Sequence, residues 1–150
     1  MVAEAGEIHY VAPGLWLWAV AHPDWQPGQG WGQLVHSTCV ETRGQVLVLD
    51  ALAPAVDSDA WGRLDRRPPT VAVVLKPDHV RDIDLFVERY GARAYGPWLF
   101  WRGNVPRTEL EAIEPGSELP GGSSPSTTGA GAWRRRFGSR TRRRSSSQMR

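Results

Sequence analysis

The sequence has one cysteine, one lysine and no long apolar run. Cys39 alone excludes an internal disulfide framework and any Cys-x-x-Cys metal or redox motif. The early apolar stretch from Leu15 to Ala21 is far shorter than the ~20 residues that a membrane span requires. Glu4 and Glu7 precede it, where a secretory signal would carry positive charge. We therefore expect a cytoplasmic protein with no membrane partner.

Acidic residues are absent from the last part of the sequence. Residues 1–122 contain ten basic and sixteen acidic side chains, a net charge of −6, whereas residues 123–150 contain eight Arg and no acid. The basic character of the chain is therefore a property of this last segment. We expect one domain over residues 1–122, followed by a disordered Arg/Ser-rich tail over residues 123–150 that has almost nothing to bury.

Several short apolar runs predict strands. Two of them, Val46–Leu49 and residues 70–75, are typical of strands that are buried on both faces: the first is continuously apolar, and the second is apolar after Thr70. Residues 33–41 and 45–49 predict a hairpin across Thr42, Arg43 and Gly44. Residues 22–32 are rich in Pro, Gly and Trp and predict a loop. Further strands are expected over residues 8–12, 15–20 and 92–95 and around residues 110–113, and a helical turn is expected within residues 51–61.

One helix is clearly indicated between residues 78 and 91. Asp78 is the expected N-cap, and Val80, Ile83, Val87 and Tyr90 follow at helical spacing, widened by Phe86. Gly91 is expected to end the helix in a left-handed conformation. Strand, helix and strand in this order predict a βαβ unit with a parallel pair of strands.

This order of elements, from residue 8 to residue 120, resembles the N-terminal half of the metallo-β-lactamase-fold hydrolases. The resemblance implies an α/β (α+β) fold, the N-terminal half of a metallo-β-lactamase-like αββα sandwich. In that family the turn before the helix carries Thr-His-x-His-x-Asp-His and then Gly-Gly, and the His residues hold zinc. Alignment on the end of the helix places Lys76 at the Thr, Pro77 at the first His, His79 at the second, Arg81 at the Asp and Asp82 at the third His; Asp84 and Leu85 fall at the glycines.

The resemblance therefore leaves a metal motif that is reduced to one residue, His79. A hydrolytic zinc needs three protein ligands and an open position for water, but Pro77 has no donor atom and Arg81 brings a positive charge. His79 and Asp82 are the remaining candidate metal ligands and would form a weak site at most. The simpler interpretation of His79 is a partly exposed residue in the first helical turn. Zinc is the cofactor of the resembling family, and we expect none here.

Other polar residues near this turn have alternative interpretations. Asp78, Asp82 and Asp84 suit a helix N-terminus, because its dipole favours carboxylates. Lys76 and Arg81 could recognise an anion, although ion pairing with the same acids is the simpler interpretation. Trp25 and Trp31 could form an apolar lip over a substrate groove, or could fill a core or an interface. For Cys39 we expect a buried packing role, and for His9, His22 and His36 ordinary surface or strand positions.

The Arg/Ser-rich tail is also what GC-rich DNA yields when it is read out of frame. With suitable codons, residues 123–132 read in the neighbouring frame as Leu-Val-Ala-Leu-Tyr-Asp-Gly-Arg-Gly-Arg, a strand-like run and a turn. We therefore interpret residues 123–150 as a frameshift product that replaces the second half of the sandwich. The alternative is a genuine basic tail that binds nucleic acid or another polyanion without sequence preference.

The sequence thus predicts a truncated hydrolase-like protein that lacks catalytic activity, although its intact relatives would act on an unidentified small-molecule substrate. The resemblance to metallo-hydrolases does not by itself make this chain an enzyme. Nucleic acid is not expected as a partner of the domain itself. A half sandwich would expose an apolar, helix-free face of its sheet, so we expect marginal stability unless the protein associates with itself.

Overall fold

The computed structural model describes residues 6–120; residues 1–5 and 121–150, and with them the expected disordered tail, lie outside the described residues. Within residues 6–120 the fold is mixed α/β, with one seven-stranded sheet and two helices. The elements in chain order are β1 (Ile8–Ala12), β2 (Leu15–Ala21), β3 (Leu34–Glu41), β4 (Val46–Leu49), α1 (Asp59–Arg66), β5 (Val71–Val73), α2 (Ile83–Tyr90), β6 (Arg93–Gly96) and β7 (Glu111–Ala112).

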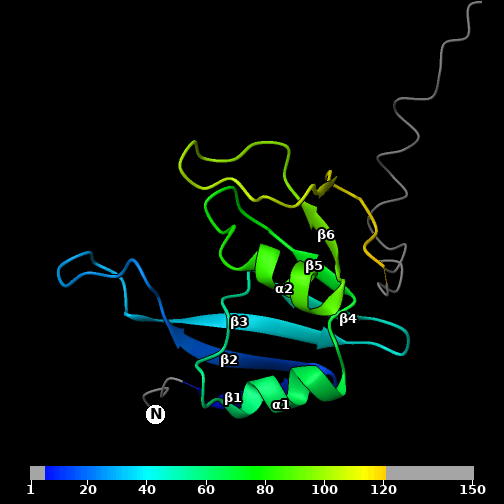
Figure 1. Cartoon of the computed structure of the whole chain (residues 1–150), viewed down its shortest axis with the longest axis horizontal. Helices are drawn as coiled ribbons and strands as arrows, with labels where there is room; N and C mark the ends of the chain where they lie inside the picture. Colours follow the sequence, from blue (N-terminus) through cyan, green and yellow to red (C-terminus); the bar gives the residue numbers. More distant parts are fainter. Residues whose placement is uncertain (1–5, 121–150) are drawn as a thin grey trace, which may run out of the picture.

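The strands lie in the sheet in the order in which they occur in the chain (Figure 1). Strands β1 to β4 are antiparallel to their neighbours, whereas β4 to β7 are parallel. The pairing of β3 with β4 confirms the predicted hairpin across residues 42–44. The parallel pairing of β5 with β6 on either side of α2 confirms the βαβ unit. The sheet therefore changes from antiparallel to parallel at β4.

Both helices pack on the same face of the sheet (Figure 1). Apolar side chains of alternate strand residues form the core with them, because successive strand residues point to opposite faces. The largest fully buried members are Trp16, Trp18 and Phe86, and the indole of Trp18 lies 6.4 Å from the Phe86 ring. Cys39 is fully buried in the same core, as predicted.

Helix α1 extends well beyond the helical turn that the sequence predicted within residues 51–61. Ser58 caps it: its Oγ accepts a hydrogen bond from the backbone N–H of Ala60 at 3.2 Å and donates one to the carbonyl of Gly6 at 2.9 Å. Ala60 and Leu64, spaced i and i+4, are the residues that α1 buries. Two buried residues among many charges give a weak helical pattern, which explains why the full length was missed.

A buried carboxylate joins α1 to β3. The side chain of Glu41 is only 7% exposed and accepts hydrogen bonds from Trp16 Nε1 at 2.8 Å, Arg63 Nε at 3.1 Å and Arg67 Nη1 at 2.6 Å. Burial alone would raise the pKa of Glu41, but these donors outweigh it and hold the pKa below its ordinary value. The carboxylate is thus satisfied by two guanidinium groups and an indole.

Helix α2 begins at Ile83, and the prediction that Asp78 is its N-cap is wrong. Residues 78–82 form a turn instead, because Arg81 adopts a left-handed conformation, φ +47°, that an α-helix does not allow. Asp82 takes the N-cap position, without a capping hydrogen bond from its side chain. The helix ends at Gly91, φ +67°, as predicted.

The opposite face of the sheet is also apolar, and no helix of residues 6–120 packs on it. Leu47, Val71, Val73 and Tyr95 form a second buried cluster there. Ile113 and Leu119, from the segment that follows β7, pack against this cluster. The predicted helix-free face is therefore present, and part of it is covered by the last described residues.

Candidate functional site

The candidate site lies at the carboxyl ends of β4 and β5. Asp50 follows β4, and the turn over residues 74–82 follows β5. Two long loops, residues 22–33 and 97–110, extend toward the same side of the molecule (Figure 1). Because the carboxyl ends of neighbouring parallel strands meet at one edge of a sheet, polar residues far apart in the sequence come together here.

Asp50 is the centre of the hydrogen bonding in this site. Its backbone is left-handed, φ +46°, and its N–H donates to the carbonyl of Val73 at 2.9 Å. One carboxylate oxygen, Oδ1, accepts from the N–H of Leu75 at 2.7 Å. The other, Oδ2, lies 2.9 Å from the imidazole Nδ1 of His79. Asp50 thus fixes the end of β4 to the turn after β5.

His79, the predicted metal ligand, is therefore engaged through Nδ1 with Asp50. Its side chain is 27% exposed and that of Asp50 is 17% exposed, so the pair is largely removed from solvent. The backbone N–H of His79 donates to the carbonyl of Lys76 at 2.9 Å, which closes the turn. The described geometry agrees with a partly exposed turn residue that is held by a carboxylate.

Arg81 is half-buried and binds backbone carbonyls of two other segments. Its Nη1 donates to the carbonyl of Asp50 and, at 3.3 Å, to the carbonyl of His36. Its Nε is buried without a hydrogen-bond partner among the described residues. Partial burial lowers the pKa of the Arg81 guanidinium from its ordinary value. Three carboxylates oppose that shift, those of Asp50, Asp78 and Asp82.

Asp82, the second predicted metal ligand, is bound to the backbone just after Asp50. Its Oδ2 accepts a hydrogen bond from the N–H of Ala53 at 2.6 Å, and its N–H donates to the carbonyl of Ala51 at 3.1 Å. Asp82 therefore joins the start of α2 to the segment that follows β4. In the described part of the chain, no group of three or more His, Cys, Asp or Glu side chains is arranged to hold a metal ion.

The remaining charged residues of the turn pair among themselves. Lys76 Nζ lies 3.7 Å from Asp78 Oδ1, with both side chains more than half exposed. This agrees with ion pairing as the simpler interpretation of Lys76.

Asp84 has a role that sequence reasoning missed. Its carboxylate accepts hydrogen bonds from the backbone N–H groups of Arg107 at 3.0 Å and Thr108 at 2.8 Å. Burial would raise the pKa of Asp84, but these hydrogen bonds outweigh it and hold the pKa below its ordinary value. Asp84 thus anchors the loop of residues 97–110 to the first turn of α2. The only sequence signal was its place near a helix N-terminus.

A cleft of about 290 Å³ opens between the turn and the two long loops. His22 and Asp24 line it from the loop of residues 22–33, and Gly103 and Asn104 line it from the loop of residues 97–110. The turn contributes Asp78, Arg81 and Asp82. With three Asp and one Arg, the lining carries an excess of negative charge, which disfavours an anionic ligand.

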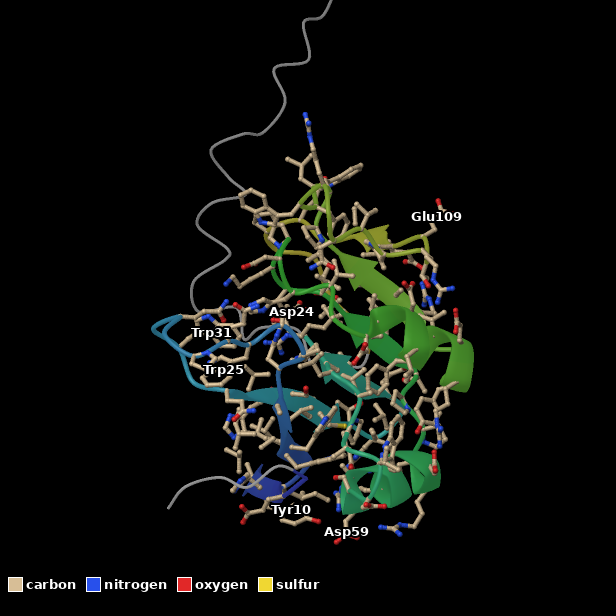
Figure 2. All side chains as sticks on the ribbon, turned by 60° about the vertical axis from the view of Figure 1, so that its left-hand side comes forward. Tyr10, Asp24, Trp25, Trp31, Asp59 and Glu109 are labelled. Atoms are coloured by element: carbon tan, nitrogen blue, oxygen red, sulfur yellow. The ribbon has the colours of Figure 1, made fainter. Side chains whose placement is uncertain are left out.

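The two Trp residues of the loop over residues 22–33 contact each other away from the core. Trp25 Nε1 donates to the carbonyl of Trp31 at 2.9 Å, and Trp31 packs edge-on against His22 at 5.2 Å between ring centroids. Figure 2 shows both indoles on the outer part of this loop, with Asp24 nearer the middle of the molecule. Trp31 is 42% exposed, so the core interpretation fails for this residue, and a lip over the cleft remains a proposal.

Comparison with protein-family models found no family that matches the chain, and comparison with curated proteins found no matching relative. Neither helix in residues 6–120 has the length and apolar character needed to cross a membrane.

Proposed function

We propose that residues 8–120 are the first half of a metallo-β-lactamase-like αββα sandwich. Two features of the described fold support this proposal. The sheet is antiparallel up to β4 and parallel beyond it, and both helices lie on one face and leave the other for a second layer. The turn after β5 also leads into a helix at the carboxyl edge of the sheet, where the hydrolases hold their metal.

The function that this geometry supports best is that of a hydrolase-like protein without metal-dependent catalysis. The observation that carries the proposal is the engagement of the candidate ligands within the protein. His79 Nδ1 is paired with Asp50, and Asp82 Oδ2 accepts from the N–H of Ala53. A metal ion that recruited either group through these atoms would have to break a hydrogen bond of 2.6–2.9 Å that holds the turn together.

Electrostatics weaken the site further. The Arg81 guanidinium occupies the position that the resemblance gives to an acidic ligand, and it lies close enough to Asp50, Asp78 and Asp82 to interact with all three carboxylates. A divalent cation beside these groups would be repelled by the guanidinium. We expect the turn to serve as a structural element that joins β4, β5 and α2.

We also propose that the protein is located in the cytoplasm.

Metal analysis combined with activity assays tests the proposal. The full chain would be dialysed against excess zinc and then buffer, its zinc content measured, and turnover of a chromogenic ester, thioester and lactam followed. We expect substoichiometric zinc and no turnover. Equimolar zinc that is lost in His79→Ala but kept in His22→Ala, accompanied by turnover, would overturn the proposal. His22 is the matched control because it lines the neighbouring cleft without joining the turn.

A second candidate function rests on the charge of the C-terminal segment. Eight Arg without an acid over residues 123–150 would bind nucleic acid through phosphate contacts, with an affinity that falls steeply as salt is added. Deletion of residues 123–150 separates the two candidates. If the tail is the binding element, the deletion should abolish all nucleic-acid binding. If the protein is only hydrolase-like, the full chain should show no specific nucleic-acid binding even before the deletion. The nucleotide sequence decides between a genuine tail and a frameshift product.

A further inference from the structure

A groove of about 580 Å³ lies between α1 and β1, the first edge strand of the sheet. This volume is within the range of ~300–1,000 Å³ that is usual for ligand clefts. Figure 2 shows Tyr10 of β1 and Asp59 of α1 at this end of the molecule, with Glu109 at the opposite end. The groove shares no lining residue with the cleft beside the turn of residues 74–82.

One wall of the groove is a single stripe of α1. Its members are spaced i, i+3, i+4 and i+7, so they share one face of the helix: Asp59, Gly62, Arg63 and Arg66. The core is on another face, where Ala60 and Leu64 are buried. Asp59, Gly62 and Arg66 are exposed, so the stripe is accessible to a ligand.

The other wall is the outer edge of β1, where the side chains of Ile8 and Tyr10 line the groove. The carbonyl of Glu7 accepts from the N–H of Ala19 on β2 at 3.3 Å. Because the backbone groups of successive strand residues point to opposite sides, the N–H and C=O groups of Ile8 and Tyr10 point away from β2. No strand of residues 6–120 pairs with β1 on that side. An edge of this kind binds an added strand through main-chain hydrogen bonds.

Strand β1 lacks the common protection of edge strands against such pairing. It contains neither proline nor a charged Lys, Arg, Asp or Glu side chain. A shift in register between Tyr10 and Ala12 limits its regular part to the residues before it. An added strand would therefore need contacts with α1 as well as with β1.

Gly62 widens the groove at the middle of the α1 stripe. Glycine weakens the interior of a helix, and α1 has only eight residues. Close packing does not require glycine here, because the nearest described atom to a Cβ would be Arg66 Nη1 at 3.7 Å, an ordinary contact. A larger side chain at this position would narrow the groove without entering the core.

Helix α1 and strand β1 run in the same direction along the groove. At its start, Ser58 donates to the carbonyl of Gly6 at 2.9 Å. Further along, the Arg63 guanidinium lies over the Tyr10 ring, 5.1 Å from its centroid. An antiparallel strand added to β1 would therefore run opposite to both elements.

The two ends of the groove carry opposite charges. Asp59 lies at the start of the stripe and Arg66 at its end, seven residues or about 10 Å further along the helix. Within residues 6–120 neither side chain takes part in an ion pair. Both charges are therefore available to a ligand of complementary charge.

We propose that this groove binds an extended peptide segment of a partner protein, which adds to β1 as an antiparallel strand. The segment begins beside Tyr10 and ends beside Ile8. Its acidic side chain therefore comes first and contacts Arg66, and its basic side chain follows and contacts Asp59. Because alternate residues of a strand share a face, these two side chains lie two or four residues apart. Main-chain hydrogen bonds supply affinity, and the two charges supply direction and sequence preference.

Selection from a random peptide library tests the proposal. Phage that display random peptides are selected on the full chain, after removal of those that bind its Gly62→Leu variant. This variant fills the groove and should stay folded, because leucine favours a helix more than glycine does. The removal step also discards peptides that bind residues 121–150, which both proteins share. We expect the enriched peptides to carry an acidic residue two or four positions before a basic one.

Fluorescence anisotropy of an enriched synthetic peptide gives the second measurement, with folding checked by circular dichroism. Gly62→Leu should abolish binding. The control Gly44→Leu, which adds the same side chain to an exposed glycine between β3 and β4, should leave binding unchanged. Arg66→Glu should weaken binding about two- to fivefold, and lysine in place of the acidic peptide residue should restore it.

Three results would overturn the proposal. The first is that no peptide is enriched on the full chain relative to Gly62→Leu. The second is binding that persists in folded Gly62→Leu or does not respond to the charge exchange at Arg66. The third is a dimer of the full chain that Gly62→Leu converts to monomers, which would assign the groove to a second copy. If Gly62→Leu does not fold, Arg66→Glu serves for the removal step and decides the question.

Discussion

The imidazole Nδ1 of His79 lies 2.9 Å from the carboxylate Oδ2 of Asp50, 29 residues earlier in the chain. This contact joins the ends of two neighbouring parallel strands, because Asp50 follows β4 and His79 lies in the turn after β5. The same carboxylate accepts from the N–H of Leu75 with its other oxygen. The histidine that sequence reasoning selected as a metal ligand thus contributes to the connection between strands.

Substitution of these two residues should change stability to different extents. His79→Ala removes one hydrogen bond and should cost about 1–2 kcal/mol in the free energy of unfolding. Asp50→Ala should cost more, because it also leaves the N–H of Leu75 without its acceptor and places Ala in a left-handed conformation. Asp50→Asn keeps an acceptor and tolerates that conformation, so its effect should be the smallest. Urea denaturation of the three variants measures this order, and an Asn variant as unstable as the Ala variant would contradict it.

Arg81 should matter far more for folding than Lys76, although both are cations of one turn. Arg81→Ala leaves the carbonyls of His36 and Asp50 without this donor and should cost about 2 kcal/mol. Lys76→Ala removes an exposed ion pair and should change the free energy of unfolding by less than about 0.5 kcal/mol. Thermal unfolding of the two variants side by side checks the difference. Equal midpoints would show that the Arg81 contacts contribute little.

Acid should destabilise the protein partly through Glu41. The folded state holds the pKa of this carboxyl below its ordinary value of 4.5, so its contribution to stability is complete above that value and is lost as the pH falls below it. Glu41→Gln should lower the free energy of unfolding by about 2–4 kcal/mol near neutral pH, because two arginines lose a buried partner. The free energy of unfolding of this variant should also fall less steeply as the pH is lowered in the acid range. An unchanged slope of the free energy of unfolding against pH would contradict the role given to Glu41.

Cys39 should be unreactive in the folded protein. Burial raises the pKa of its thiol to about 12 from an ordinary value of 9.0, so almost no thiolate forms near neutral pH. Iodoacetamide should label it only after unfolding in guanidinium chloride. Since the folded pKa lies above the unfolded one, stability should fall as the pH rises from 9.0 toward about 12, and Cys39→Ala should weaken that fall. Rapid labelling of the native protein would contradict the burial.

The secondary structure could be predicted largely because the decisive residues act locally. Gly91 ends α2 by its own left-handed conformation, and the apolar runs at β4 and β5 mark strands that are covered on both sides. Helix α1 was mostly missed, because it buries only Ala60 and Leu64 and depends on the contacts of Arg63 and Arg67 with Glu41 across the fold. Tertiary contacts of this kind leave little trace in a local pattern.

The candidate site was less predictable for the same reason. The sequence drew attention to His79 and Asp82 by their spacing, yet each binds a partner on the segment after β4, Asp50 or Ala53. The start of α2 was misplaced because the left-handed Arg81 binds carbonyls of β3 and of Asp50, the residue after β4. A pattern read along one segment does not contain partners that lie 29 to 45 residues away.

The strict sequence order of the strands has a consequence for synthesis on the ribosome. Each strand from β2 to β7 pairs with the strand made just before it, so its partner has already been synthesised when the new strand emerges. No strand has to wait for a distant later segment, and the sheet can grow from one edge to the other in the direction of translation. The seven strands of residues 6–120 all precede residue 121, so each of these strands has its described partners within the part of the chain that is translated before that residue.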